Sequence, residues 1–225
     1  MIAEALALTL RLAVTVSAIL LVLGVPLAYW LAFSKRRWMF LAESLVSLPI
    51  VLPPTVLGFY VLVALGPLSP FGRWWLSVTG HTLAFTFSGL VIGSVLYSLP
   101  FAVQPMETAF ASIDRKLLDA SALLGASRWR TFWRIVLPLG MPGVVTGMVL
   151  SFAHTLGEFG VVLMVGGNIP GATRTISILI FDQVEALDYR VANHTAALLL
   201  GLCFALLATL YGLRGRTAWN LWGWK

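Results

Sequence analysis

Five long apolar segments, separated by short polar stretches, dominate the pattern of this 225-residue chain. A helix needs about 20 residues to cross the hydrocarbon core of a bilayer. A backbone in lipid must satisfy its own hydrogen bonds, so such segments are expected to be helices. They extend over about Leu12–Phe33, Leu45–Leu65, Leu83–Val103, Gly140–Val165 and His194–Leu213. The pattern predicts an all-α membrane protein with five transmembrane helices, or six at most.

Composition and charge support the membrane class and predict an orientation. The chain is 59% hydrophobic and only 11% charged, against about 25% charged in soluble domains. Its net charge of +6 does not indicate nucleic-acid binding, because no basic face with interleaved aromatic residues is present. Eleven of the fifteen basic residues fall on one side, which the positive-inside rule makes cytoplasmic. They are Lys35, Arg36, Arg37, Arg115, Lys116, Arg128, Arg130, Arg134, Arg214, Arg216 and Lys225.

This orientation divides the rest of the chain. Residues 1–11 form a periplasmic N-terminus, residues 66–82 and 166–193 form periplasmic loops, and residues 214–225 form a Trp-rich cytoplasmic tail at the membrane surface. Glu4, rather than a basic cluster, precedes the first apolar segment, and Lys35 to Arg37 follow it. Because a signal peptide has the reverse charge order, the first segment is interpreted as a retained span.

Neither a catalytic nor a cofactor site is indicated. Cys203 is the only cysteine, which excludes an intrachain disulfide and a thiolate-only metal site. His81, His154 and His194 are far apart and are interpreted as interfacial polar residues rather than metal ligands. The sequence contains no G-x-x-x-x-G-K-[ST] phosphate-binding loop, so any coupled ATP hydrolysis must come from a separate subunit. The chain is therefore expected to be a non-catalytic subunit with no cofactor.

The cytoplasmic loop of residues 104–139 is too long for a turn and has helical periodicity. We expect two short amphipathic helices separated at Gly125, with Ser127 capping the second and Pro138 ending it. One interpretation of such a loop is a basic segment that rests on anionic lipid. The alternative is an element that docks on a cytoplasmic partner.

The spacing within this loop favours docking. The stretch DASALLGASRWRTFWRIVLPLGMPG resembles the EAA loop of ABC-importer permeases, in which an acidic residue, two small residues, a glycine and Ile-x-Leu-Pro recur at fixed positions. The resemblance implies a type I ABC-importer permease fold with a cytoplasmic coupling helix that moves with the ATPase. The residues implied to couple are Asp119, Ala120, Ser121, Gly125, Ala126, Arg128, Trp129, Phe132, Ile135, Leu137 and Pro138.

Two spans carry features that suggest a pathway or gate. Pro49, Pro53 and Pro54, followed by Thr55, predict a kink or break in the second span, although prolines also fit the first turn of a helix that starts late. Glu158, between Gly157 and Gly160, is an acid inside an apolar segment and is expected to be paired. A free carboxylate would repel an anion, so Glu158 is interpreted as a structural group rather than an anion ligand.

The loop after the fourth span is rich in turn-forming residues. Asn168, Pro170, Thr173 and Arg174 lie on the predicted periplasmic side. Thr173 and Arg174 are candidates to contact an acceptor protein or a passing oxyanion. A capped surface turn explains the same residues equally well.

These segments together resemble the permeases for tetrahedral oxyanions, and molybdate permeases in particular, through LPIVLPPTVLG, GEFG and NIPGATRTI. The resemblance covers residues 8–212 and implies a homodimer in the bacterial inner membrane, two cytoplasmic ATPase subunits and a periplasmic binding protein. It implies alternating access along the dimer interface, where Gly143, Gly147 and Ser151 would permit close helix packing. Molybdate, or tungstate of the same shape and charge, is the expected cargo. Sulfate, thiosulfate or another oxyanion is the alternative, followed by a stand-alone channel or secondary transporter.

Overall fold

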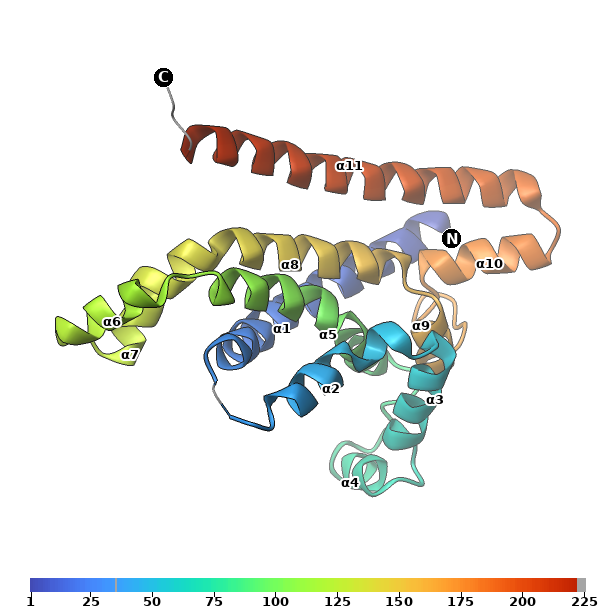
Figure 1. Ribbon diagram of the computed structural model, residues 1–225. Helices are drawn as coiled ribbons and strands as arrows, with labels where there is room; N and C mark the ends of the chain where they lie inside the picture. Colours follow the sequence, from blue (N-terminus) through green and yellow to red (C-terminus); the bar gives the residue numbers. More distant parts are fainter. Residues whose placement is uncertain (35, 222–225) are drawn as a thin grey trace.

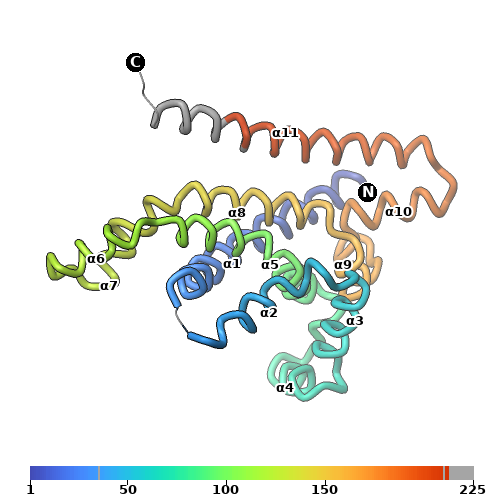
Figure 2. The backbone as a smooth tube through the Cα atoms, viewed as in Figure 1, coloured from blue at the N-terminus to red at the C-terminus, as the bar shows by residue number. Residues whose placement is uncertain are grey.

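All regular structure in the described residues, 1–34 and 36–221 of the computed structural model, is helical (Figure 1). Figure 2 traces the same path as a tube from the N-terminus to the C-terminus. The elements are α1 (Ile2–Phe33), α2 (Met39–Val51), α3 (Pro54–Leu65), α4 (Pro70–Thr79), α5 (Phe87–Ala111), α6 (Arg115–Leu123), α7 (Arg128–Thr131), the π-helical turn η1 (Phe132–Val136), α8 (Leu137–Gly157), α9 (Gly160–Gly166), α10 (Ile176–Glu185) and α11 (Tyr189–Leu221).

Within these residues, four helical stretches are long and apolar enough to cross a membrane, and five if the bent pair α2 and α3 counts as one span. The all-α membrane class predicted from the sequence is confirmed. The bounds differ, however, because α1 begins at Ile2, so most of the expected N-terminal segment 1–11 belongs to the first helix. The predicted loops 66–82 and 166–193 likewise contain α4 and α10.

The C-terminal tail also differs from its predicted form. α11 continues to Leu221, so the first part of the expected tail, residues 214–221, extends the last helix. The remainder of the Trp-rich segment, residues 222–225, lies outside the described residues, as does Lys35.

The core lies where α1, α5 and α8 pack against one another. Two glycines allow α8 to approach α5 closely. A Cβ atom on Gly143 would lie 2.3 Å from the Cβ of Ala109, and one on Gly147 would lie 2.4 Å from the carbonyl oxygen of Ala102. Ser151 is fully buried within the same chain. The expectation that these small residues pack against a second copy is therefore wrong, because the chain's own α5 occupies the two glycine positions.

The predicted break in the second span is confirmed. α2 ends at Val51 and α3 begins at Pro54, and their axes differ by 112°. Pro54 occupies the first turn of α3, where its missing N–H costs no helical hydrogen bond. Pro53 and Pro54 therefore separate the two helices, whereas Pro49 lies inside α2.

The fourth span is not the continuous helix predicted over residues 140–165. α8 ends at Gly157, Glu158 has an extended backbone conformation (φ −67°, ψ 132°), and α9 begins only at Gly160. Glycine has a low helix propensity because it loses the most backbone entropy when a helix forms. Two glycines around Glu158 therefore weaken the helix at the position of its only acidic residue.

Pro138 does not end a helix, contrary to the prediction. α7, η1 and α8 form one continuous helical run, and Pro138 lies in the first turn of α8. In η1 the Leu137 N–H donates to the carbonyl of Phe132, five residues earlier. The wider π-helical turn leaves space for a proline ring that would clash with a carbonyl in a regular helix.

Candidate functional site

Helices α6 and α7 form a hairpin that projects from one end of the helix bundle (Figure 1). We call residues 115–131 the α6–α7 hairpin. Asp114 caps α6 by accepting a hydrogen bond from the Lys116 N–H at 2.9 Å. Ser127 caps α7 by accepting from the Arg130 N–H at 3.3 Å, as its position in the sequence predicts. Side-chain caps thus define where both helices begin.

Gly125 forms the turn of the hairpin. Its φ of +75° lies in the left-handed region, which glycine enters without the steric cost that other residues incur. A Cβ atom at this position would meet nothing within 4 Å. Within this chain, Gly125 is therefore required for backbone conformation and not for close packing.

A hydrogen bond holds the two arms of the hairpin together. The hydroxyl oxygens of Ser121 and Thr131 lie 2.8 Å apart, and the Ala126 N–H donates to the Ser121 carbonyl at 3.1 Å. Ser121 is buried although it belongs to a projecting element. The small residue expected at this position therefore stabilises the hairpin internally.

The tip of the hairpin exposes apolar side chains. Leu123 and Leu124 are 89% and 88% exposed, and Trp129 is 70% exposed. Asp119 and Ala120 are exposed on the same element. Phe132 instead turns inward and meets the ring of Tyr29 edge-on at 5.3 Å. The predicted coupling residues thus form two sets. One set is exposed to a partner, and the other, which includes Phe132 and Leu137, packs against the core of the bundle; Ile135 is half-buried.

The breaks in the second and fourth spans meet in space. A Cβ atom on Gly160, at the start of α9, would lie 2.6 Å from the Cβ of Pro54, at the start of α3. A Cβ atom on Gly58 would lie 2.8 Å from the Cβ of Met164. Two short helices therefore pack closely immediately after their breaks. Pro49, by contrast, is buried on α2, away from this contact.

A cleft of about 530 Å³ opens beside these breaks. Glu158 lines it and is 3% exposed, and neither carboxyl oxygen has a hydrogen-bond partner among the described residues. The side chain is therefore not paired as predicted. The other predicted residues that line the cleft are Pro54, Thr55, Gly157 and Gly160.

Sequence reasoning missed two residues of this cleft. Tyr97 and His154 both line it, and the His154 Nδ1 lies 3.0 Å from the hydroxyl of Ser98. The ring of Phe101 stacks on His154 at 4.0 Å. His154 is thus a half-buried member of the cleft rather than an interfacial residue. Both residues are polar side chains inside apolar segments, which is a feature that the sequence shows. The sequence does not show that the two side chains lie in the same cleft.

The turn of residues 168–174 is held by its own polar groups. Asn168 donates through Nδ2 to the Asp182 carboxylate oxygens at 2.7 and 2.8 Å, and Arg174 lies 3.5 Å from the same carboxylate. Arg174 also donates to the Asn168 side-chain oxygen. Thr173 is fully buried and donates to the Gly166 carbonyl at 2.7 Å. Pro170 is exposed. This geometry is that of a capped turn in which the Arg174 charge is already paired.

A family model described as "binding-protein-dependent transport system inner membrane component" matches residues 24–213. The chain belongs to this family. It is therefore a non-catalytic, multi-pass permease of the inner membrane.

Several relatives are similar to this permease over nearly its whole length. The "molybdenum transport system permease protein ModB" of Azotobacter vinelandii is 49% identical over 210 residues, which is 93% of each chain. The protein of the same name from Mycobacterium tuberculosis strain H37Rv is 38% identical, over 95% of this permease and 79% of that protein. A "probable sulfate transport system permease protein cysT" of Chlorokybus atmophyticus is 34% identical over 73% of this permease and 57% of its own length.

Solved structures confirm the fold of the permease. A chain of the MetNI methionine ABC transporter in an inward facing conformation has a TM-score of 0.74 and 15% identity, covering 95% of this permease and 94% of that chain. A chain of a bacterial alginate ABC transporter, in complex with a pentasaccharide-bound periplasmic protein, has a TM-score of 0.72 and 19% identity, covering 95% and 78%. The predicted type I importer permease fold is confirmed.

Proposed function

We propose that this chain is the permease subunit of an ATP-driven importer of molybdate. The observation that carries the proposal is the 49% identity to the Azotobacter vinelandii molybdenum permease, which extends over 93% of both chains. Tungstate has the same shape and charge and is expected to pass by the same route. Sulfate is the second candidate, because a sulfate permease from Chlorokybus atmophyticus is 34% identical over 73% of this chain.

In this proposal the permease forms a homodimer, with its N-terminus periplasmic and its C-terminus cytoplasmic. Two ATPase subunits bind on the cytoplasmic side, and a periplasmic binding protein delivers the oxyanion. The family description, which specifies binding-protein-dependent transport, supports the last partner. The absence of a phosphate-binding loop from the sequence supports separate ATPase subunits.

The α6–α7 hairpin is the docking element for the ATPase. It projects beyond the bundle, and its tip exposes Leu123 and Leu124 almost completely. Buried in a cleft of a partner, such side chains would each contribute about 1.5–3 kcal/mol to association. A rigid hairpin, held by the Ser121–Thr131 hydrogen bond, can pass on a rigid-body rotation of the ATPase. Asp119, Ala120, Ala126, Arg128 and Trp129 surround the tip and complete the docking surface.

The cleft beside Glu158 is the part of the pathway contributed by this chain. Breaks in two helices meet there, and irregular backbone at membrane depth is tolerated where it is buried in protein or lines a cavity. A carboxylate would repel a dianion, so Glu158 shapes the cleft and does not bind the cargo. The turn of residues 168–174 positions α10 at the periplasmic side, since its polar groups already bind one another.

The cargo is tested by uptake of labelled molybdate, with sulfate as the competitor, in cells with and without this chain. We expect uptake that depends on the chain and resists a large excess of sulfate. Equal competition by sulfate would favour the second candidate.

The docking role is tested with Gly125→Glu in reconstituted vesicles. We expect the protein to insert but to lose its stimulation of the ATPase. Gly80→Glu is a matched control. Gly80 also has a positive φ (+77°) and open space around its Cβ position, but it lies at the end of α4, away from the hairpin. Equal stimulation by the two variants would exclude docking through the hairpin.

A further inference from the structure

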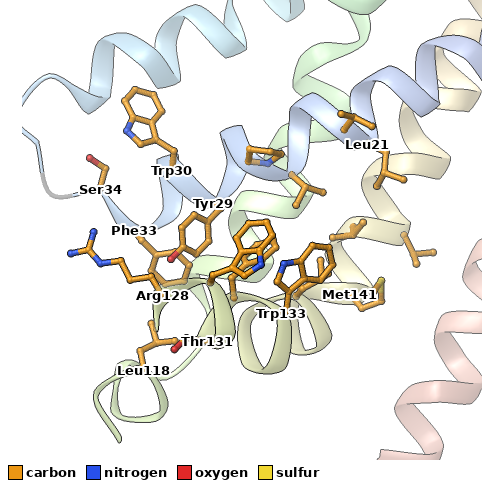
Figure 3. A pocket seen from close by; sticks show the side chains of 18 of the residues that line it. Leu21, Tyr29, Trp30, Phe33, Ser34, Leu118, Arg128, Thr131, Trp133 and Met141 are labelled. Atoms are coloured by element: carbon orange, nitrogen blue, oxygen red, sulfur yellow. The ribbon is translucent and has the colours of Figure 1, made fainter. Parts of the chain in front are cut away.

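A groove of about 1280 Å³ lies between α1, the α6–α7 hairpin and the first half of α8 (Figure 3). It belongs neither to the cleft beside Glu158 nor to the tip of the hairpin, because Glu158, Leu123 and Leu124 are not among the residues that line it. The groove adjoins the proposed docking surface, because Ala126, Arg128 and Trp129 line it, but its apolar body along α1 and α8 has no role in the proposed transport function.

The body of the groove is apolar and open on its side. Val22 on α1 is 70% exposed, and Met141 and Val145 on α8 are 43% and 45% exposed. α1 and α8 are candidate membrane spans by length and composition, and their exposed apolar side is available to acyl chains. In a bilayer, lipid acyl chains would pack against these exposed apolar side chains.

The end of the groove near the hairpin is basic and aromatic. Arg36 and Arg128 line it together with Trp30, Trp129 and Trp133, and no acidic residue lines it. In the described part of the chain, no carboxylate lies within 4 Å of either guanidinium. Figure 3 shows Arg128 extending from the hairpin toward the end of α1, near Phe33 and Ser34. Tryptophan and arginine at this depth are typical of the boundary between acyl chains and headgroups.

We propose that this groove binds an anionic phospholipid of the leaflet on the hairpin side. An acyl chain lies along Val22 and Val145, and the phosphate group accepts hydrogen bonds from Arg36 and Arg128. Basic pockets between transmembrane helices on the cytoplasmic side are suited to anionic headgroups. A two-fold contact that placed the groove against itself in a second copy would bring the same two arginines together, which disfavours that occupant.

The position of the lipid gives it a role in coupling. Leu118 and Thr131 of the hairpin line the groove opposite Tyr29 and Phe33 of α1 (Figure 3). A bound lipid would therefore fill the space behind the hairpin and hold it at a fixed distance from the first helix. The hairpin of a lipid-free permease would be less well supported when the ATPase moves it.

Lipid retention is measured by native mass spectrometry of the assembled transporter, purified in detergent with equal amounts of phosphatidylglycerol and phosphatidylcholine. We expect phosphatidylglycerol to be retained preferentially. Arg36→Gln should lower its retention about fivefold, as expected for the loss of one basic residue near an anionic surface. Arg73→Gln is the matched control, because Arg73 is an exposed arginine on α4 that does not line the groove.

A groove-filling variant, Val145→Trp, should lower the retention of both lipids, because the indole occupies the position of the acyl chain. Equal retention of the two lipids by the unmodified transporter, or the same retention in Arg36→Gln and Arg73→Gln, would overturn the proposal. So would efficient cross-linking of Val22→Cys to a neighbouring subunit, since a protein surface would then occupy the groove. None of these measurements depends on the identity of the transported anion.

Discussion

The close contact between α5 and α8 provides a sharp test of the fold. In Gly147→Ala the new Cβ atom would lie 2.4 Å from the Ala102 carbonyl oxygen, whereas ordinary contacts begin near 3.4 Å. The obstacle is backbone, so the helices themselves must separate by about 1 Å at this point. Overpacking of this kind costs about 1–3 kcal/mol. Replacing a mid-helix glycine by alanine returns at most about 1 kcal/mol of helix propensity, so the net effect is destabilising.

Gly201→Ala is the matched control. Gly201 lies in the middle of α11, and a Cβ atom there would meet nothing within 4 Å. This variant gains the same helix propensity without a steric cost and should be stabilised by about 0.5–1 kcal/mol.

Reversible unfolding in mixed micelles, followed by circular dichroism as the fraction of denaturing detergent rises, measures both free energies of unfolding. We expect Gly147→Ala to be less stable than the unmodified chain and Gly201→Ala to be at least as stable. If both variants gained stability equally, α5 and α8 could not be packed as closely as described. If Gly147→Ala impaired dimerisation but left the free energy of unfolding unchanged, Gly147 would lie at the interface between copies and not against α5.

Three further predictions concern the polar groups of the chain. Ser121→Ala removes the 2.8 Å contact with Thr131, worth about 1 kcal/mol, so amide hydrogen exchange should accelerate about fivefold in residues 115–131 only; acceleration throughout α5 would contradict a local role. Asp182→Asn removes the charge that Arg174 and Asn168 share, so the turn of residues 168–174 should become cleavable by added protease while the melting temperature of the core is retained. Glu158→Leu replaces two buried carboxyl oxygens, which have no hydrogen-bond partner in the described part of the chain, by apolar atoms, so the melting temperature should rise; a lower value would reveal a partner for the carboxyl group.

The hairpin illustrates how much the sequence could predict. Its position between two apolar segments, the Gly125 turn and the Ser127 cap all follow from local physics, because backbone conformation and capping depend on neighbouring residues. The end of its second helix did not follow. A proline within a helix usually ends it, but here a π-helical turn precedes Pro138 and the helix continues. The sequence does not predict this turn.

The cleft illustrates the reverse. The prolines predicted the break in the second span, and Glu158 was recognisable as an acid inside an apolar segment. That both breaks meet at Pro54 and Gly160, with Tyr97 and His154 beside them, depends on contacts between residues up to about 100 positions apart. No periodicity in a single chain encodes such contacts without an alignment.

By itself, the sequence determined the all-helical membrane class, the approximate spans and the family, because hydrophobic length, basic-residue distribution and motif spacing are local properties. The tertiary structure alone decided which groups are free and which are already bound. Arg174 looked available for an anion, yet it pairs with Asp182. Glu158 was expected to be paired, yet its carboxyl oxygens have no hydrogen-bond partner in the described part of the chain. Gly143 and Gly147 looked like an interface between copies, yet α5 of the same chain fills it. In each case the deciding quantity is a distance between elements, which depends on how the helices pack rather than on the order of residues within them.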